Sequence, residues 1–193
     1  MNRTVPVLAA VVVLLAGCEI VIETTTPSTG EPATEPAALA DLDVTAEDPE
    51  GYDRALFGDY DRDEVLAATQ ERWPDCDGFY SAADDQCHAS EDDVQVDHIV
   101  ALSEAWDSGA SGWSTVQLDE FGGDLDNLWV MTTELNLAKT YGDAAEWLPP
   151  HEPAVCDYVA AYIAVKAEWG LTVDPAEHDA LAAALGDCGD AAT

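Results

Sequence analysis

The chain of 193 residues carries 40 Asp and Glu against six Lys and Arg, which gives a formal net charge of −34. Because these acids are mixed with 48% hydrophobic residues and six tryptophans, the composition excludes a wholly disordered acidic chain. The charge also excludes a broad basic surface for nucleic acid and repels any polyanion at low salt. It favours a salt-rich habitat, where ions screen repulsion over about 3 Å at 1 M, with an acidic protein of no special habitat as the alternative.

The N-terminus has the pattern of an export signal. Arg3 precedes an apolar run over residues 5–16, which is too short for a comfortable membrane span. Small residues lead into Cys18 and resemble a lipoprotein signal, in which residues 1–17 are removed and Cys18 is acylated. A plain signal peptide with an incidental cysteine is the alternative. We therefore expect a protein that is lipid-anchored to the outer face of the cell membrane or secreted.

A tether and one folded domain follow the signal. Residues 18–49 are rich in Thr, Pro and Glu and lack a periodic apolar pattern, so we expect them to be disordered. The folded domain is expected over residues 50–190. Its first part reads as a helix over residues 62–73 and then a polar loop or weak hairpin over residues 75–93.

The middle of the domain is predicted to run strand, connection, strand, helix. The first strand covers residues 94–100, where apolar and polar side chains alternate. A turn at residues 108–112 lies in the connection, and a second short strand covers residues 128–131. A helix is predicted from about residue 132, with an acid in its first turn. The fold class is therefore α+β and mostly helical.

Two helices are predicted at the C-terminal end. Apolar residues recur at helical spacing over residues 155–169, and Gly170 is a typical stop. Asp174, Pro175 and Glu177 have the pattern of a cap, a first-turn proline and a capping-box acid that open a second helix ending near Gly186. Short connections make such helices antiparallel neighbours, so we expect a helical hairpin.

Four cysteines remain after Cys18, an even number in a chain sent to an oxidising compartment. Four cysteines allow three pairings. Cys156 and Cys188 fall at the open end of the predicted hairpin, which favours a bond between them and leaves Cys76 to pair with Cys87. A four-cysteine zinc site is disfavoured because no CxxC pair is present.

Polar side chains with a chemical pattern gather on the strand–strand–helix segment. They are Asp97 and His98, side by side in the first strand, Asn127 before the second strand, and Asn136 and Lys139 on the next helix. These residues resemble a motif of the HNH endonucleases of ββα-metal architecture. The motif consists here of DHIV, then DN before an apolar strand, and then N-x-x-K. VDHIVALSEAWDSGA, DNL, NLAK, EWLPP and VK-x-x-WGLTVD are similar to the exported DUF1524 type, relatives of the GmrSD C-terminal domain. The resemblance implies a ββα-metal core with flanking helices and the C-terminal hairpin.

The resemblance also implies a role for each of these residues. Asp97 and the side-chain oxygen of Asn136 would bind one divalent cation, Mg²⁺ in the first place and Mn²⁺ or another ion as the alternative. His98 would take the proton from the attacking water, and the Asn127 amide would fix the loop that presents His98. Lys139 would reach a substrate phosphate. The structural alternatives are a core histidine, a turn asparagine, a surface asparagine and a lysine that favours the helix dipole.

Strand geometry sets a condition on this site. Adjacent strand residues face opposite ways, so Asp97 and His98 can reach one ion only where the strand bends or ends. The leading hypothesis is a metal-dependent, salt-adapted endonuclease that cuts DNA with little sequence preference and binds it weakly. The alternative is a non-catalytic acidic surface lipoprotein, or a cation-binding module, on the same scaffold. A nuclease toxin or defence component is a third reading that the residues do not separate from nutrient scavenging.

Overall fold

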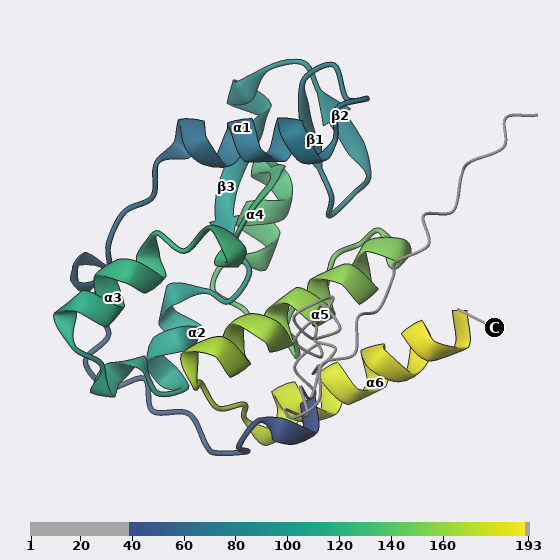
Figure 1. The fold of residues 1–193 in the computed structure, drawn as a ribbon. Coiled ribbons are helices and arrows are strands. Elements are labelled where there is room, and N and C mark those ends of the chain that lie inside the picture. Colours follow the sequence, from purple (N-terminus) through teal and green to yellow (C-terminus); the bar gives the residue numbers. More distant parts are fainter. Residues whose placement is uncertain (1–38, 192–193) are drawn as a thin grey trace, which may run out of the picture. The chain divides into compact units, whose positions relative to one another are not determined.

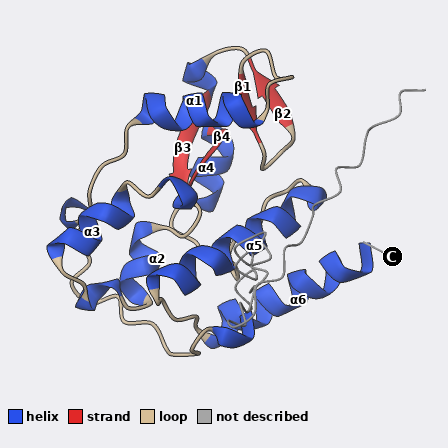
Figure 2. Ribbon diagram, in the orientation of Figure 1, coloured by secondary structure: helices blue, strands red, loops and turns tan. Residues whose placement is uncertain are grey.

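The computed structural model describes residues 39–191, so the predicted signal peptide, Cys18 and most of the predicted tether lie outside the described residues. Six α-helices and two separate two-stranded sheets form this part of the chain (Figures 1 and 2). The fold is α+β and mainly helical, as predicted. Within the described range, none of the helices combines the length and the apolar character that a membrane span requires. Single 3₁₀ turns lie between the larger elements, at Leu39–Asp41, Arg54–Leu56, Glu91–Asp93, Ala110–Gly112 and Leu125–Asn127.

A pair of antiparallel strands with a helix on each face forms the centre of the domain. β3 (Val94–His98) pairs with β4 (Leu128–Thr132), and α4 (Thr133–Lys139) follows β4 directly. This is the strand–strand–helix order that the sequence predicts. α1 (Arg62–Arg72) covers the face on which alternate apolar residues of both strands pack against Val65 and Leu66 of the helix. α4 contacts the other face (Figure 2).

The connection between β3 and β4 contains two helices that the sequence analysis did not predict. α2 (Leu102–Asp107) and α3 (Thr115–Gly122) both contribute buried side chains to the larger hydrophobic core. α3 starts at Ser114, whose hydroxyl accepts from the backbone of Gln117 in a capping box. Helices of six and eight residues show too few periodic positions to stand out in a sequence, because burial rather than propensity stabilises them.

The segment before β3 is a small hairpin. β1 (Phe79–Ser81) and β2 (Gln86–His88) pair antiparallel, and the disulfide between Cys76 and Cys87 joins the start of the segment to β2. The sequence is compatible with either a loop or a weak hairpin over residues 75–93, and the structure shows the hairpin. The predicted pairing of these two cysteines is confirmed.

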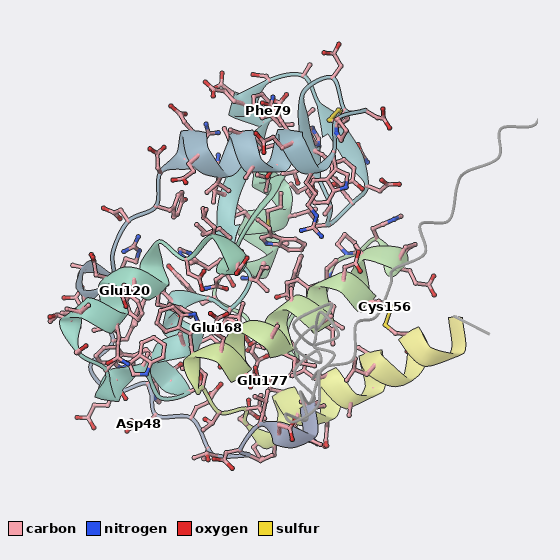
Figure 3. All side chains as sticks on the ribbon, viewed as in Figure 1. Asp48, Phe79, Glu120, Cys156, Glu168 and Glu177 are labelled. Atoms are coloured by element: carbon pink, nitrogen blue, oxygen red, sulfur yellow. A yellow bond between two sulfur atoms is a disulfide. The ribbon has the colours of Figure 1, made fainter. Side chains whose placement is uncertain are left out.

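The C-terminal hairpin is also confirmed. α5 (Glu152–Trp169) ends at Gly170, which adopts the left-handed conformation with φ 65°, and α6 (Pro175–Ala191) runs back beside it. The disulfide between Cys156 and Cys188 ties the two helices together, as the yellow bond beside Cys156 in Figure 3 shows. The predicted end near Gly186 is wrong: one glycine costs a helix about 1 kcal/mol, which is too little to end it here.

The packed part of the chain starts earlier than residue 50. Leu39 and Leu42 are buried against the larger core. Val44 forms a β-bridge with Val173, and Thr45 donates its backbone N–H to the Val173 carbonyl at 2.8 Å. The end of the predicted tether is thus paired with the residues that lead into α6.

Candidate active site

Asp97 lies near the end of β3 and faces α4. Its carboxylate Oδ2 is 2.9 Å from Lys139 Nζ, and its side chain keeps 16% of its surface exposed. The same ammonium donates to the His98 carbonyl at 2.8 Å. One lysine therefore holds both the carboxylate of Asp97 and the backbone of the next residue, which fixes the end of the strand.

Lys139 is placed differently from the phosphate ligand that the resemblance implies. It is the last residue of α4, and its side chain is completely buried between the helix and β3. A buried ammonium needs a counter-charge, which Asp97 supplies. In this position Lys139 cannot touch a phosphate that arrives from solvent. Helical spacing predicted a side chain near Asn136, but it could not tell that this side chain points inward.

His98 faces the side of the strand opposite to Asp97, so the alternation of β3 continues to its last residue. Its Nε2 lies 3.0 Å from the Gly122 carbonyl, and its ring packs edge-on against Tyr60 with centroids 5.7 Å apart. Because a carbonyl only accepts, Nε2 carries the proton, and Nδ1 of the neutral ring keeps a free lone pair. Burial lowers the pKa of the imidazole, which favours this neutral form.

Asn127 holds the loop that follows His98. Its side-chain Oδ1 accepts from the Val100 backbone N–H at 2.8 Å, and its Nδ2 donates to the Val100 carbonyl at 3.1 Å. Its own carbonyl accepts from the Ile99 N–H at 2.7 Å. The side chain is fully buried, so these contacts fix the two residues after His98. A role of Asn127 in catalysis remains a prediction.

Asn136 is on α4 and is half-buried. Its backbone carbonyl accepts from the Thr140 N–H at 2.9 Å. Because the side chain is only half-buried, its amide is open to solvent. Asp97 and Asn136 come from β3 and α4, which are in contact.

The donor atoms at this position suit a hard divalent cation. Asp97 Oδ2 faces Lys139 without the geometry of a hydrogen bond, and its second oxygen is not part of that ion pair. Together with the Asn136 amide oxygen, Asp97 offers the oxygen ligands that Mg²⁺ prefers. One carboxylate and one neutral amide also leave most of the ion's charge uncompensated. The residues present therefore fit such a cation.

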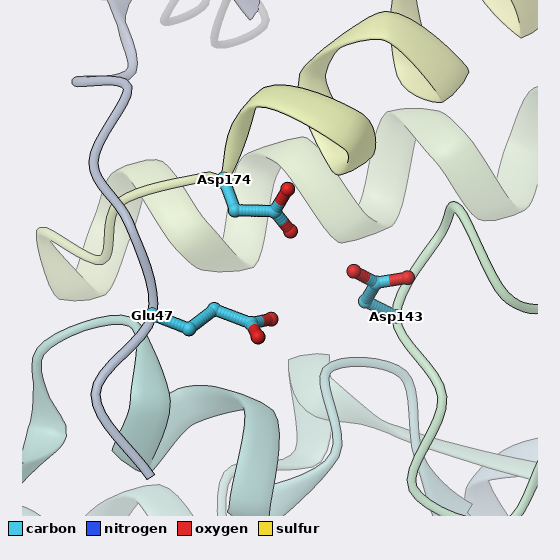
Figure 4. Close-up of side chains that lie close together, drawn as sticks. All are labelled: Glu47, Asp143 and Asp174. Atoms are coloured by element: carbon cyan, nitrogen blue, oxygen red, sulfur yellow. The ribbon is translucent and has the colours of Figure 1, made fainter.

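A second group of carboxylates, which no sequence pattern predicts, lies outside the strand–strand–helix segment. Oxygens of Glu47, Asp143 and Asp174 lie within 4.8 Å of one another and turn toward a common point (Figure 4). Asp143 and Asp174 already accept backbone N–H groups of the turns that follow them. Burial and the neighbouring acids raise the pKa of Glu47 and of Asp143. No spacing signal points to residues so far apart in the chain.

A buried ion cluster joins α2, α5 and α6. Lys166 Nζ lies 2.6 Å from a carboxylate oxygen of Glu104 and 2.6 Å from one of Glu177, which is labelled in Figure 3. It also donates to the Thr172 carbonyl at 2.8 Å. Burial raises the pKa of Glu104 to about 8, although Lys166 opposes the shift. With this raised pKa Glu104 keeps its proton near neutral pH, so the Lys166 ammonium is balanced by the Glu177 carboxylate.

Comparisons with known proteins agree with the sequence resemblance. Residues 60–184 match the family described as GmrSD restriction endonucleases, C-terminal domain. An uncharacterized secreted protein of Arthroderma benhamiae is 32% identical over 200 residues, which cover 94% of this chain and 97% of that protein. No solved structure matches the chain. The matched range includes every residue predicted for the site: Asp97, His98, Asn127, Asn136 and Lys139.

Proposed function

Because the chain belongs to the family of the GmrSD restriction endonuclease C-terminal domain, we propose that it is a metal-dependent endonuclease that hydrolyses DNA with low sequence specificity. The observation that supports this most is the arrangement at the end of β3. There the ion-paired carboxylate of Asp97 and the hydrogen-bonded ring of His98 adjoin a loop clamped by Asn127. The reaction class follows from these residue types, since a base and a lightly ligated cation are what phosphodiester hydrolysis requires.

His98 is the proposed general base. The Gly122 carbonyl holds the Nε2 proton and leaves Nδ1 free. The ring lies on the strand face opposite to Asp97, so the proposal requires that Nδ1 reaches the attacking water around the end of β3, which stops at His98. The Asn127 clamp on Val100 keeps the backbone after His98 from moving. General-base help of this kind typically contributes about 10²–10⁴-fold to the rate.

Asp97 and Asn136 are the proposed ligands of the cation. A bound Mg²⁺ or Mn²⁺ would supply Lewis-acid stabilisation of the charge that develops on the phosphate and the leaving oxygen. Lys139 positions Asp97 by holding Oδ2, and its hydrogen bond to the His98 carbonyl ties the base to the same anchor. Positioning is its proposed role in place of the phosphate contact.

The proposed setting is outside the cell. A relative described as secreted supports export, and we propose that Cys18 carries a lipid that holds the enzyme at the outer face of the membrane. The formal charge of −34 suits a salt-rich medium, in which DNA binding is weak and depends on salt.

Plasmid cleavage tests the proposal. The mature protein is incubated with supercoiled plasmid in molar salt with Mg²⁺ or Mn²⁺, beside His98→Ala and the matched control His178→Ala on α6. We expect the wild type and the control to nick the plasmid, EDTA to stop them, and His98→Ala to lose most activity. If all three proteins act equally on the plasmid and EDTA makes no difference, the proposed nuclease function is wrong.

One observation favours a second candidate, a non-catalytic acidic surface lipoprotein on the same scaffold. The ion pair of Asp97 with the buried Lys139 would also serve simply to fix α4 against β3. In that case the wild type would leave plasmid intact with every divalent cation, while Lys139→Met would still lower the melting temperature.

A further inference from the structure

The chain between Phe57 and Tyr60 leads into α1 and lies against both hydrophobic cores. Phe57 is buried in the larger core, and Tyr60 packs against the smaller core that the apolar face of β3 shares with α1. Between them, the N–H of Gly58 donates to the Leu118 carbonyl of α3 at 3.3 Å, and in Figure 1 the chain before α1 runs past α3. We call these four residues the 57–60 segment. Both groups that contact the His98 ring are placed by this segment.

Tyr60 is the first of these groups. Its hydroxyl donates to the Val96 carbonyl of β3 at 3.1 Å, and its ring packs against the imidazole of His98 with centroids 5.7 Å apart and planes at 67°. Val96 lies two residues before His98, so the hydroxyl bond and the ring contact tie Tyr60 to one stretch of β3. Edge-to-face rings at this distance attract each other beyond the area that they bury. The hydroxyl therefore holds the tyrosine ring where it covers the imidazole.

The carbonyl of Gly122 is the second group. Gly122 is the last residue of α3, where carbonyls have no partner within the helix, and His98 Nε2 donates to this one at 3.0 Å. A Cβ on Gly122 would lie 2.7 Å from the Gly58 nitrogen and 2.8 Å from the Gly58 carbonyl carbon, so the two backbones touch. Only glycine allows so close an approach. The 57–60 segment therefore sets the position of the carbonyl to which His98 is bonded.

These two contacts fix the imidazole ring, whereas the other contacts at the site fix the main chain. Asn127 bonds to the backbone of the loop after β3, and Lys139 bonds to the His98 carbonyl. Rotation of the ring by half a turn would put a carbon atom against the Gly122 carbonyl, and the buried hydrogen bond would be lost. Movement in the direction of Tyr60 is blocked by the tyrosine ring. The imidazole is thus held in one orientation, with Nδ1 as its unbonded nitrogen.

We propose that Tyr60 is a positioning residue of the proposed general base, an inference that rests on the proposed nuclease function. The imidazole must keep Nδ1 directed to the end of β3, where the attacking water has to arrive, and Tyr60 keeps the ring from turning into the space that the tyrosine fills. Because Tyr60 acts only through His98, its loss leaves substrate binding unchanged. A lower kcat at constant KM is the kinetic sign of such a role.

The test combines plasmid nicking with nuclear magnetic resonance of the histidine rings in the mature protein. Nicking in molar salt with Mg²⁺ gives kcat and KM. The exchange of the His98 Nε2 proton with water reports whether the ring stays bonded to Gly122, and His98→Ala identifies that signal. For Tyr60→Ala we expect faster exchange and a kcat about 10²-fold lower at constant KM, because a displacement of about 1 Å in a catalytic group costs about that much. Tyr60→Phe keeps the ring and should recover most of the rate and of the protection.

Tyr80→Ala is the matched control. Tyr80 is a half-buried tyrosine on β1 with the same two kinds of contact: its ring packs against Trp73 with centroids 4.7 Å apart, and its hydroxyl donates to Asp85 Oδ1 at 2.6 Å. These contacts lie outside the candidate site. Tyr80→Ala should therefore lower the melting temperature without changing kcat or the exchange of the His98 proton.

Three results would overturn the proposal. They are a Tyr60→Ala protein with unchanged kcat and exchange, a Tyr80→Ala protein that loses as much of both, and a rise in KM at unchanged kcat, which would make Tyr60 a substrate contact. If Tyr60→Ala does not fold, Tyr60→Leu keeps the apolar bulk without the flat ring: it should be slow where Tyr60→Phe is fast, and equal rates would overturn the proposal too. Failure of the proposed function is seen separately, as wild-type protein that leaves the plasmid intact while the Nε2 proton still responds to Tyr60→Ala.

Discussion

Two lysines are buried beside carboxylates in this protein, and their surroundings differ. Lys139 meets one carboxylate, that of Asp97, which keeps 16% of its side chain exposed. Lys166 meets two, from Glu104 and Glu177, and these keep 4% or less. Lys139 faces a single carboxylate, whereas Lys166 faces two carboxyl groups, and burial raises the pKa of one of them, Glu104, to about 8.

The difference separates an ion pair that can change partner from one that cannot. A partly exposed carboxylate can exchange part of its contact with an ammonium for contact with a cation. A closed cluster leaves no path for that exchange, and removing one member leaves a buried charge unpaired. We therefore propose that the Lys139 pair belongs to the proposed active site and that the Lys166 cluster serves stability.

The largest effect is expected from Lys166→Met. It leaves Glu104 and Glu177 buried without a counter-charge, and breaking such a cluster costs about 3–5 kcal/mol. Urea unfolding of the mature protein measures the loss. Adding Glu104→Gln and Glu177→Gln to the same chain should recover part of it. A loss under about 1 kcal/mol would mean that the cluster is not structural.

Lys139→Met should act on the reaction. Without its anchor the Asp97 carboxylate moves, and a displacement of about 1 Å in a catalytic group can cost about 10²-fold in rate. We expect kcat to fall about that far while KM changes little. A rise in KM at unchanged kcat would instead assign Lys139 to the phosphate contact and reject the positioning role.

Asn127→Ala should destabilise the loop after His98. It leaves the Val100 N–H and carbonyl without their side-chain partners in a buried place, at a cost of about 2 kcal/mol. Asn136→Ala is the control, because the Asn136 side chain is half-buried whereas that of Asn127 is fully buried: it should weaken the metal dependence and leave the melting temperature unchanged. Equal thermal shifts in the two variants would contradict this division of roles.

A change of one pH unit is expected to alter the free energy of unfolding by less than Lys166→Met or Asn127→Ala does. The pKa of Glu104 is about 8 in the folded chain against an ordinary 4.5. Between these values the folded state holds a proton that the unfolded state has released, so the free energy of unfolding falls as pH rises. The slope reaches up to about 1.4 kcal/mol per pH unit and disappears above the folded pKa. Glu104→Gln should flatten this slope in urea titrations, and an unchanged slope would place the proton elsewhere.

Local patterns predicted the elements that local interactions determine. The capping residues around Asp174 and the stop at Gly170 locate the C-terminal hairpin, and from the hairpin follow both disulfides. Alternation located β3, and a short apolar run over residues 128–131 located β4. Helices α2 and α3 were not predicted, because short helices are stabilised by packing against the core and not by their local sequence.

Only part of the candidate site could be predicted from the sequence. Residue type and order along the chain bring Asp97, Asn127 and Asn136 to neighbouring elements. The Asn127 side chain bonds to Val100 in the loop after His98, while its role in catalysis stays a prediction. The burial of Lys139 depends on how α4 is rotated against β3, which is a property of packing. The carboxylates of Glu47, Asp143 and Asp174 meet only through the tertiary fold, so no local pattern reveals them.

Anomalous diffraction from crystals of the mature protein soaked in Mn²⁺ tests the central claim most directly. The account predicts a peak bonded to Asp97 and Asn136, with the His98 ring turned to a water beside it. A peak confined to Glu47, Asp143 and Asp174, with Asp97 still paired to Lys139, would contradict it.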